Sequence, residues 1–314
     1  MTERPKAFVM STIPPDLRSA LSERCVLIER GSVPGWPSQP LRGVRIAATT
    51  SMAGVDAASL DGLPDLEIVI CNGAGLDRID LAAARSRKVA VCHTPDELAD
   101  DVGEAVIALT YAVMRRVAEA DRFVRSGRWS GERMTPSTRV FGKTMGIVGL
   151  GRIGRRAAML AEGIGMKVLY HGRHWQQEVP YPFVSDLRDL AAQSDVLVLS
   201  CPAGEETRNL VGHAVLERLG PKGYLVNVSR GSVVDEQALL AALSAGTIAG
   251  AALDVFASEP NIDPRWKDLD NVVLQPHSTS ITHETRAAMI SRLTRDLDAF
   301  LQGKPFHDAA RAHA

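Results

Sequence analysis

An arginine, a glutamate and a histidine are the residues of this chain best suited to do chemistry. Arg230 ends one apolar segment, Glu259 comes shortly after a second, and His277 comes shortly after a third. In a sheet of parallel strands, such positions meet at the carboxyl edge, where ligands bind. A guanidinium binds a carboxylate through two parallel hydrogen bonds, and an imidazole exchanges a proton near neutral pH. The set therefore indicates a site that binds an acid and moves a proton.

Reduction of a 2-oxo acid fits this set. The reaction needs a hydride donor, a cation for the carboxylate, a proton donor for the developing alkoxide, and a group that keeps this donor protonated. Arg230 and His277 provide the cation and the proton donor, and Glu259 would orient the imidazole and favour its protonated form. Asp254 either accepts from a nicotinamide carboxamide or holds a neighbouring group. Each of these residues, taken alone, could have a purely structural role. The occurrence of Arg230, Glu259 and His277 in this order favours an active site.

A glycine-rich segment indicates where the hydride donor binds. It reads Gly-Ile-Val-Gly-Leu-Gly-Arg-Ile-Gly and contains the pattern GxGxxG at Gly149, Gly151 and Gly154. These glycines suit a tight turn, a close approach of the backbone to a pyrophosphate, and close packing of a helix on a strand. A helix that starts near Ile153 would direct its free N–H groups at the pyrophosphate.

The residues after the next apolar strand bear on the choice of dinucleotide. An NAD-preferring site places Asp or Glu at this strand end, about 20 residues beyond the glycines, to bind the ribose 2′-hydroxyl. Here the strand ends at His171, and the first carboxylate after it is Glu178. Arg173 can pair with a 2′-phosphate, although it can also be a solvated loop charge, and Arg152 is a second candidate cation. We expect NADP(H) to be preferred, with NAD(H) possible.

Composition excludes several other classes. The 314 residues have a net charge of −1, which gives no reason to expect nucleic-acid binding. No apolar run reaches the roughly 18 residues that a membrane helix needs, and the first apolar run is short enough for a strand rather than a signal peptide. The 4 cysteines are scattered without a CxxC pair, so we expect reduced thiols, no metal and a cytoplasmic protein.

Short apolar runs alternate with helical patterns along the whole chain, which is typical of parallel sheets covered on both faces. We therefore predict the α/β class, with two Rossmann-like domains. The runs that predict strands are Ala7–Met10, Val26–Ile28, Val44–Ala48, Leu66–Cys71, Val89–Cys92, Met145–Val148, Lys167–Tyr170, Val196–Ser200, Tyr224–Val228, Ala249–Leu253 and Val272–Leu274.

Two long helices mark the expected domain boundaries. One begins after Thr94, whose spacing from Glu97 suits a capping box, and its apolar stripe continues to Val117. The other covers about 282–301. The domains predicted are a flavodoxin-like substrate domain of residues 1–98 and 282–314, and an inserted dinucleotide-binding domain of residues 99–281.

The chain resembles the D-isomer-specific 2-hydroxyacid dehydrogenases over nearly its whole length. The resemblance implies that Arg230 binds substrate, that His277 is the acid/base with Glu259 as its partner, and that Asp254 contacts the nicotinamide amide. Its motifs are Asn72–Asp80, Gly149–Gly154, Cys201-Pro202, Asn227–Gly231, Val234-Asp235, Leu253–Pro260 and Pro276-His277.

By the same resemblance, other segments would contact the ligands. Cys201 and Pro202 would border the cofactor groove, with Thr207 nearby, and a loop of small residues would offer N–H groups to the substrate carboxylate. That loop consists of Asn72, Gly73, Ala74 and Gly75.

The segments Asp100–Val102, Arg116–Trp129 and His283–Arg286 resemble the NADPH-dependent glyoxylate/hydroxypyruvate reductase and hydroxyphenylpyruvate reductase branch. Thr279 departs from that branch, which commonly has Gly or Ala there, and would face the nicotinamide or the substrate.

The same resemblance has implications for the substrate and for the oligomeric state. Met52 would meet a small 2-oxo acid such as glyoxylate or hydroxypyruvate, with arylpyruvates or 2-ketoaldonates as alternatives; it can also be a core residue. A homodimer is implied, with an arm at 125–143 and Trp129 as its anchor. Two other classes stay open. They are a nucleotide-sensing, corepressor-like binding protein and a different Rossmann enzyme that uses bound cofactor.

Overall fold

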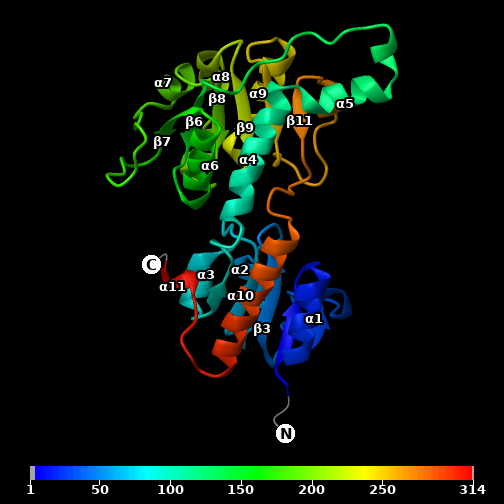
Figure 1. Ribbon diagram of the computed structural model, residues 1–314. Coiled ribbons are helices and arrows are strands. Elements are labelled where there is room, and N and C mark those ends of the chain that lie inside the picture. Colours follow the sequence, from blue (N-terminus) through cyan, green and yellow to red (C-terminus); the bar gives the residue numbers. More distant parts are fainter. Residues whose placement is uncertain (1–3, 313–314) are drawn as a thin grey trace. The chain divides into compact units, whose positions relative to one another are not determined.

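A computed structural model describes residues 4–312 of the chain. The chain divides into two compact units (Figure 1). The first unit combines the residues up to Leu98 with those from Thr282 onward, and the second is Ala99–Ile281. Among the described residues, no helix combines the length and the apolar character needed to cross a membrane.

The first unit is a parallel sheet with helices on both faces. Its strand order is β2-β1-β3-β4-β5, which is the order of flavodoxin-like sheets. Its elements are β1 (Lys6–Val9), α1 (Pro15–Arg24), β2 (Val26–Glu29), the 3₁₀ turn η1 (Arg30–Ser32), β3 (Val44–Thr50), α2 (Ala57–Asp61), β4 (Ile68–Asn72), α3 (Leu81–Ser86), β5 (Ala90–Cys92), α10 (His283–Leu301) and α11 (Ala309–Ala312).

The strands of this sheet are apolar on both sides because each side has its own helical layer. Ala7 and Val9 of β1 pack with the buried side chains of α1 and α10, whereas Phe8 between them packs on the opposite face. That opposite face is covered by α2, α3 and α11, which contribute Leu60, Ala84 and Ala309 among others. The carboxyl ends of the strands are thus left as the part of the sheet that loops can line.

The second unit is also a parallel sheet, with strand order β11-β10-β9-β8-β6-β7. A single parallel bridge from Tyr170 to Phe183 extends it beyond β7. Its elements are α4 (Ala99–Met114), α5 (Val117–Arg125), η2 (Arg128–Ser130), β6 (Thr144–Val148), α6 (Arg152–Gly163), β7 (Lys167–His171), α7 (Leu187–Ala192), β8 (Val196–Leu199), η3 (Glu205–Thr207), α8 (His213–Leu219), β9 (Tyr224–Asn227), η4 (Gly231–Val233), α9 (Glu236–Ser244), β10 (Gly250–Leu253), η5 (Pro264–Asp268) and β11 (Val272–Leu274).

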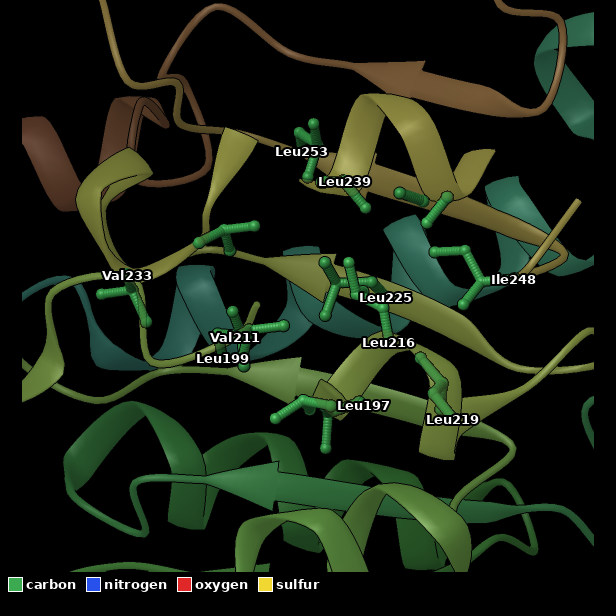
Figure 2. Close-up of a cluster of buried hydrophobic side chains, with 14 of the residues drawn as sticks. Leu197, Leu199, Val211, Leu216, Leu219, Leu225, Val233, Leu239, Ile248 and Leu253 are labelled. Carbon is green, nitrogen blue, oxygen red and sulfur yellow. The ribbon is translucent and has the colours of Figure 1, made fainter. Parts of the chain in front are cut away.

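The core of the second unit explains why its strands read as continuous apolar runs. Leu197 and Leu199 of β8 and Leu225 of β9 pack against α7, α8 and α9 (Figure 2). The other face of the sheet is covered by α4, which contacts α6, β9 and β10. The predicted class of two parallel α/β sheets is therefore confirmed, and each predicted strand is found within about two residues of its expected bounds.

The predicted start of the first long helix is wrong. Thr94 and Glu97 do not form a capping box, because α4 begins only at Ala99. The Thr94 N–H donates instead to the carbonyl of Gly73 (3.0 Å), and the Glu97 carboxylate pairs with Arg292 (3.4 Å). Tertiary contacts within the first unit have thus replaced the local capping interaction.

The expected continuation of this helix to Val117 is also wrong. Arg116 has a φ of 55°, which separates α4 from α5. Its guanidinium donates to the Glu119 carboxylate (2.6 Å) and holds the break in place. Beyond α5 the chain is irregular as expected, and Trp129 is 60% exposed. The homodimer anchored by Trp129 stays a prediction that light scattering at micromolar concentration can test.

Candidate active site

Three neighbouring strands of the second sheet end level with one another. Leu253, the last residue of β10, is the register partner of Asn227 in β9 and of Leu274 in β11. The segments that follow these strands contain Arg230, Asp254 with Glu259, and His277. The sheet register therefore brings together side chains that are far apart in the sequence.

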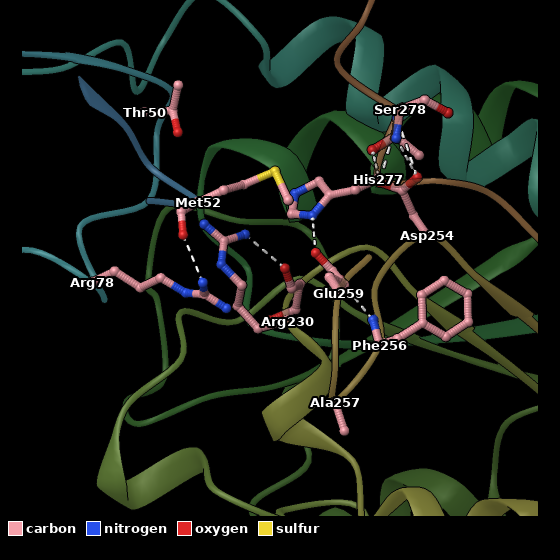
Figure 3. A network of polar contacts seen from close by, with 12 residues as sticks. Thr50, Met52, Arg78, Arg230, Asp254, Phe256, Ala257, Glu259, His277 and Ser278 are labelled. Carbon is pink, nitrogen blue, oxygen red and sulfur yellow. Dashed lines mark hydrogen bonds and ion pairs between the residues drawn. The ribbon is translucent and has the colours of Figure 1, made fainter. Parts of the chain in front are cut away.

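Glu259 and His277 form a direct pair within this cluster. The Nδ1 atom of His277 lies 2.8 Å from Oε2 of Glu259, and the backbone N–H of Phe256 donates to Oε1 at 2.8 Å (Figure 3). The Glu259 side chain is only 11% exposed and that of His277 is 22% exposed. With Nδ1 bonded to the carboxylate, Nε2 is the nitrogen left for proton exchange with a bound ligand.

The Glu259 carboxyl remains ionised in this surrounding. Burial opposes its ionisation, but the hydrogen bonds from His277 and from the Phe256 N–H, with the charges of His277 and Arg230, outweigh burial. As a result the pKa of Glu259 lies below its usual value. The carboxylate is thus negative throughout the neutral range and stabilises a positive charge on the imidazole beside it.

Asn227 determines the shape of the loop that carries Arg230. The Asn227 amide donates to the Arg230 carbonyl (3.1 Å) and accepts from the Ser229 N–H (3.0 Å). The next residue, Gly231, has to be a glycine, because a Cβ there would lie 1.9 Å from the carbonyl carbon of Phe256. Sequence reasoning assigned no role to Asn227; an amide at the end of an apolar strand was the available signal.

Asp254 holds the neighbouring turn, one of the two roles considered for it. It is 1% exposed, and its Oδ1 accepts from the Ser278 N–H at 2.7 Å. Its Oδ2 accepts from the Thr279 hydroxyl at 2.6 Å. The Thr279 hydroxyl, which we expected to face the nicotinamide or the substrate, is therefore directed at Asp254.

The glycines of the fingerprint have separable steric roles. Gly149 has a φ of 92°, and a Cβ there would lie 2.6 Å from the Cα of Cys201. A Cβ on Gly154 would lie 2.2 Å from the carbonyl oxygen of Gly149, whereas a Cβ on Gly151 would meet nothing within 4 Å. The first and third glycines thus close the junction of β6, α6 and β8, and Gly151 leaves its backbone open to a ligand.

A groove of about 850 Å³ runs along this junction. Arg152, Ile153 and Gly154 form the first turn of α6 rather than the wall of the groove. Glu205 and Glu206 line it as well, and sequence reasoning did not anticipate these carboxylates. The predicted cofactor residues that line the groove are Gly149, Gly151, His171, Arg173, Cys201, Pro202 and Thr207.

The groove and the Arg230 loop are directly connected. The hydroxyl of Ser229, next to Arg230, donates to the carbonyl of Cys201. The open backbone at Gly151 and the volume of the groove fit a dinucleotide, whose nicotinamide end would then approach the Arg230 loop.

The opposite end of the groove contains basic residues. Nδ1 of His171 contacts the Val184 carbonyl at 2.9 Å, and its ring lies parallel to that of Phe183. Arg173 is exposed beside it. Gln176, which the sequence did not single out, accepts from Arg155 at 2.6 Å and donates to the Leu150 carbonyl at 3.1 Å.

The predicted substrate loop of the first unit is held by backbone contacts. Gly73 has a φ of 137°, and a Cβ there would lie 2.2 Å from Oγ of Ser51. The carbonyl of Ala74 lies 3.0 Å from Nδ1 of His93. Met52 is 42% exposed, so the alternative that it is a core residue is wrong.

The sheet order and the glycine-lined groove define the second unit as a dinucleotide-binding α/β unit. Comparison with known proteins agrees, because residues 107–279 match the family model "D-isomer specific 2-hydroxyacid dehydrogenase, NAD binding domain".

Relatives match most of the chain. Glyoxylate/hydroxypyruvate reductase A of Arabidopsis thaliana is 43% identical over 83% of each chain, and 2-ketogluconate reductase of Gluconobacter oxydans is 38% identical over 97% of this chain and 98% of the relative. The crystal structure of an NADPH-dependent glyoxylate/hydroxypyruvate reductase from Sinorhizobium meliloti, in complex with NADP and malonate, has a TM-score of 0.88 at 34% identity and covers 95% of this chain and 94% of its own. This chain belongs to the D-isomer-specific 2-hydroxyacid dehydrogenase family. It is an NAD(P)-dependent 2-hydroxyacid dehydrogenase.

The steric role of Gly154 can be tested by adding one methyl group. We expect Gly154→Ala to weaken binding of the reduced nicotinamide dinucleotide at least about tenfold, because the new Cβ would force the α6 N-terminus away from the Gly149 carbonyl. Fluorescence titration with NADPH measures this affinity. The matched control is Gly163→Ala at the other end of α6, where a Cβ meets nothing within 4 Å. Equal affinities for the two variants would contradict the assigned role.

Proposed function

We propose that this protein reduces a small 2-oxo acid to the D-2-hydroxy acid, with NADPH preferred over NADH. Glyoxylate and hydroxypyruvate are the first candidates, because reductases of these acids are among the similar proteins. The observation that carries the proposal is the 2.8 Å pair of Glu259 and His277 on a sheet edge shared with Arg230. We assign dinucleotide binding to the second unit and substrate selection to the first.

The residues divide the reaction between them. A nicotinamide dinucleotide supplies the hydride when bound. The Arg230 guanidinium binds the substrate carboxylate and the carbonyl oxygen, which withdraws electron density from the reacting carbon. His277 donates the proton from Nε2 to the oxygen as negative charge develops there. The ionised Glu259 holds the ring at Nδ1 and places a negative charge beside it until this transfer.

In the first unit, the N–H groups of Asn72–Gly75 are assigned to the substrate carboxylate, and Met52 to the substrate side chain. The positive φ of Gly73, where an added Cβ would lie 2.2 Å from Oγ of Ser51, supports a loop whose backbone, rather than its side chains, faces a ligand. A 2-ketoaldonate is the second candidate substrate, since 2-ketogluconate reductase matches 97% of the chain.

Preference for NADP(H) is supported by the charge at the end of β7. His171 stands where an NAD-preferring site has a carboxylate, and Arg173 is exposed beside it on the wall of the groove. A guanidinium there would bind a 2′-phosphate, and no carboxylate at the strand end would repel it.

The reaction itself can be tested with purified protein. NADPH oxidation is followed with glyoxylate, hydroxypyruvate, hydroxyphenylpyruvate and 2-ketogluconate, and the chirality of glycerate formed from hydroxypyruvate is determined. We expect D-glycerate, with His277→Ala and Arg230→Ala each lowering kcat/KM at least about 100-fold. Turnover that survives both substitutions would contradict the mechanism. NADPH binding without turnover would instead indicate a nucleotide-sensing protein.

The pH dependence tests the role of Glu259. Its lowered pKa keeps it ionised at every pH above its ordinary value of 4.5, so it does not limit the rate there. We expect Glu259→Gln to lower kcat for reduction at least about tenfold at every pH above 4.5, because an amide places no negative charge beside the ring and cannot hold Nδ1 as the carboxylate does.

A matched control for this experiment is the exposed pair of His213 and Glu217, which lie 3.4 Å apart. Glu217→Gln should leave the pH profile of reduction unchanged. A wild-type kcat in Glu259→Gln across this pH range would show that Glu259 does not influence the proton donor.

Selectivity for the dinucleotide can be tested at Arg173. We expect Arg173→Ala to lower kcat/KM for NADPH about 10–100-fold, which corresponds to the loss of a charge-assisted hydrogen bond to phosphate. The kcat/KM for NADH should stay within about threefold of the wild-type value. Arg188→Ala removes another exposed arginine of the same unit and should alter neither value. A wild-type protein that uses NADH more efficiently than NADPH would overturn the preference.

A further inference from the structure

Thr279 makes a contact that has no role in the proposed reaction as described above. Its hydroxyl donates to Oδ2 of Asp254 at 2.6 Å, and its backbone N–H lies 3.3 Å from each carboxylate oxygen. Thr279 is 8% exposed and Asp254 is 1% exposed. The contact is therefore shielded from water, where a hydrogen bond to a charged group is strongest.

The turn that this contact stabilises contains the histidine. His277 has a φ of 55°, in the left-handed region that non-glycine residues rarely adopt. Such a conformation persists only where the surrounding structure holds it. The backbone N–H of His277 donates to the Asp254 carbonyl at 2.9 Å, and the next N–H, of Ser278, donates to Asp254 Oδ1 at 2.7 Å. One residue at the end of β10 thus holds three successive residues of the turn.

The two oxygens of Asp254 depend on different donors. Oδ1 has a short bond from the Ser278 N–H, whereas Oδ2 receives only the long contact from the Thr279 N–H besides the hydroxyl, within the part of the chain that the structure describes. Without the hydroxyl, a fully buried charged oxygen would lose its one short hydrogen bond. The carboxylate would then rotate toward another donor and release the backbone of the turn.

The imidazole is held from its other side by Glu259. The Glu259 contact fixes Nδ1 at 2.8 Å, but it does not determine the backbone from which the ring extends. The position of Nε2 consequently depends on both anchors, namely Glu259 for the ring and Asp254 for the backbone.

We propose that Thr279 is a positioning residue for the acid/base histidine, whose hydroxyl acts through Asp254 to hold the left-handed turn at His277. This proposal rests on the proposed function in one respect, namely that His277 is the acid/base. It predicts an effect on proton transfer to the bound substrate, and hence on kcat, rather than on substrate affinity.

The test compares variants that differ in one hydroxyl. Thr279→Val keeps the shape and removes the donor, and Thr279→Ser keeps the donor. In single-turnover reduction of glyoxylate by NADPH, we expect Thr279→Val to lower the rate about 10–100-fold, the effect of a small misplacement of a reacting group, with KM within about threefold of wild type. Thr279→Ser should restore the rate to within about threefold of wild type.

A second readout does not require turnover. The imidazole C2–H resonance of His277, assigned by its loss in His277→Ala, should shift or broaden in Thr279→Val and return to its wild-type position in Thr279→Ser. If the wild type reduced no 2-oxo acid, the proposed function would fail, and this resonance would still decide the role of Thr279. Thr294→Val is the control, because the Thr294 hydroxyl donates to the Ile290 carbonyl of its own helix.

Two results would overturn the proposal. One is a wild-type rate together with an unshifted His277 resonance in Thr279→Val. The other is a Thr279→Ser variant that behaves like Thr279→Val, since the hydroxyl would then not be the active feature. If Thr279→Val does not fold, as judged by its circular dichroism spectrum, Thr279→Ala serves in the same comparison, because it removes the hydroxyl without adding a methyl group.

Discussion

The common end of three parallel strands is the constraint on which the candidate site depends. Asn227, Leu253 and Leu274 are register partners, so the residues that follow β9, β10 and β11 emerge at one edge of the sheet. A shift of one residue in this register would also exchange the two faces of the strand, which both carry buried apolar side chains. The stability of the core and the assembly of the site therefore rest on the same hydrogen-bonded ladder.

Strain at the site is offset by contacts made with charged groups. A left-handed non-glycine residue such as His277 costs about 1–3 kcal/mol. Each hydrogen bond to a buried carboxylate contributes about 1.5–3 kcal/mol, and Asp254 accepts several from the turn. Glu259 adds a further contact on the ring. The strained backbone is thus held by the electrostatic network that also orients the His277 imidazole.

Much of this arrangement was predictable from residue types and spacing. The apolar runs predicted the parallel strands because both faces of such sheets are covered, and the glycine pattern located the turn before α6. The start of α4 could not be predicted, because Thr94 and Glu97 satisfy the local capping pattern but are engaged by Gly73 and Arg292. The contact of Thr279 with Asp254 was missed for a similar reason: the two residues are distant in the sequence.

The sequence by itself determined which chemical groups this protein has and in which order they follow its strands. Periodic burial and turn chemistry are local properties, so the glycines, Arg230 and His277 could be placed at strand ends without coordinates. Only the tertiary structure decided which of these groups touch. The 2.8 Å contact of Glu259 with His277 and the burial of Asp254 depend on sheet register and packing. Those are set by long-range hydrogen bonds and excluded volume, which no short stretch of sequence contains.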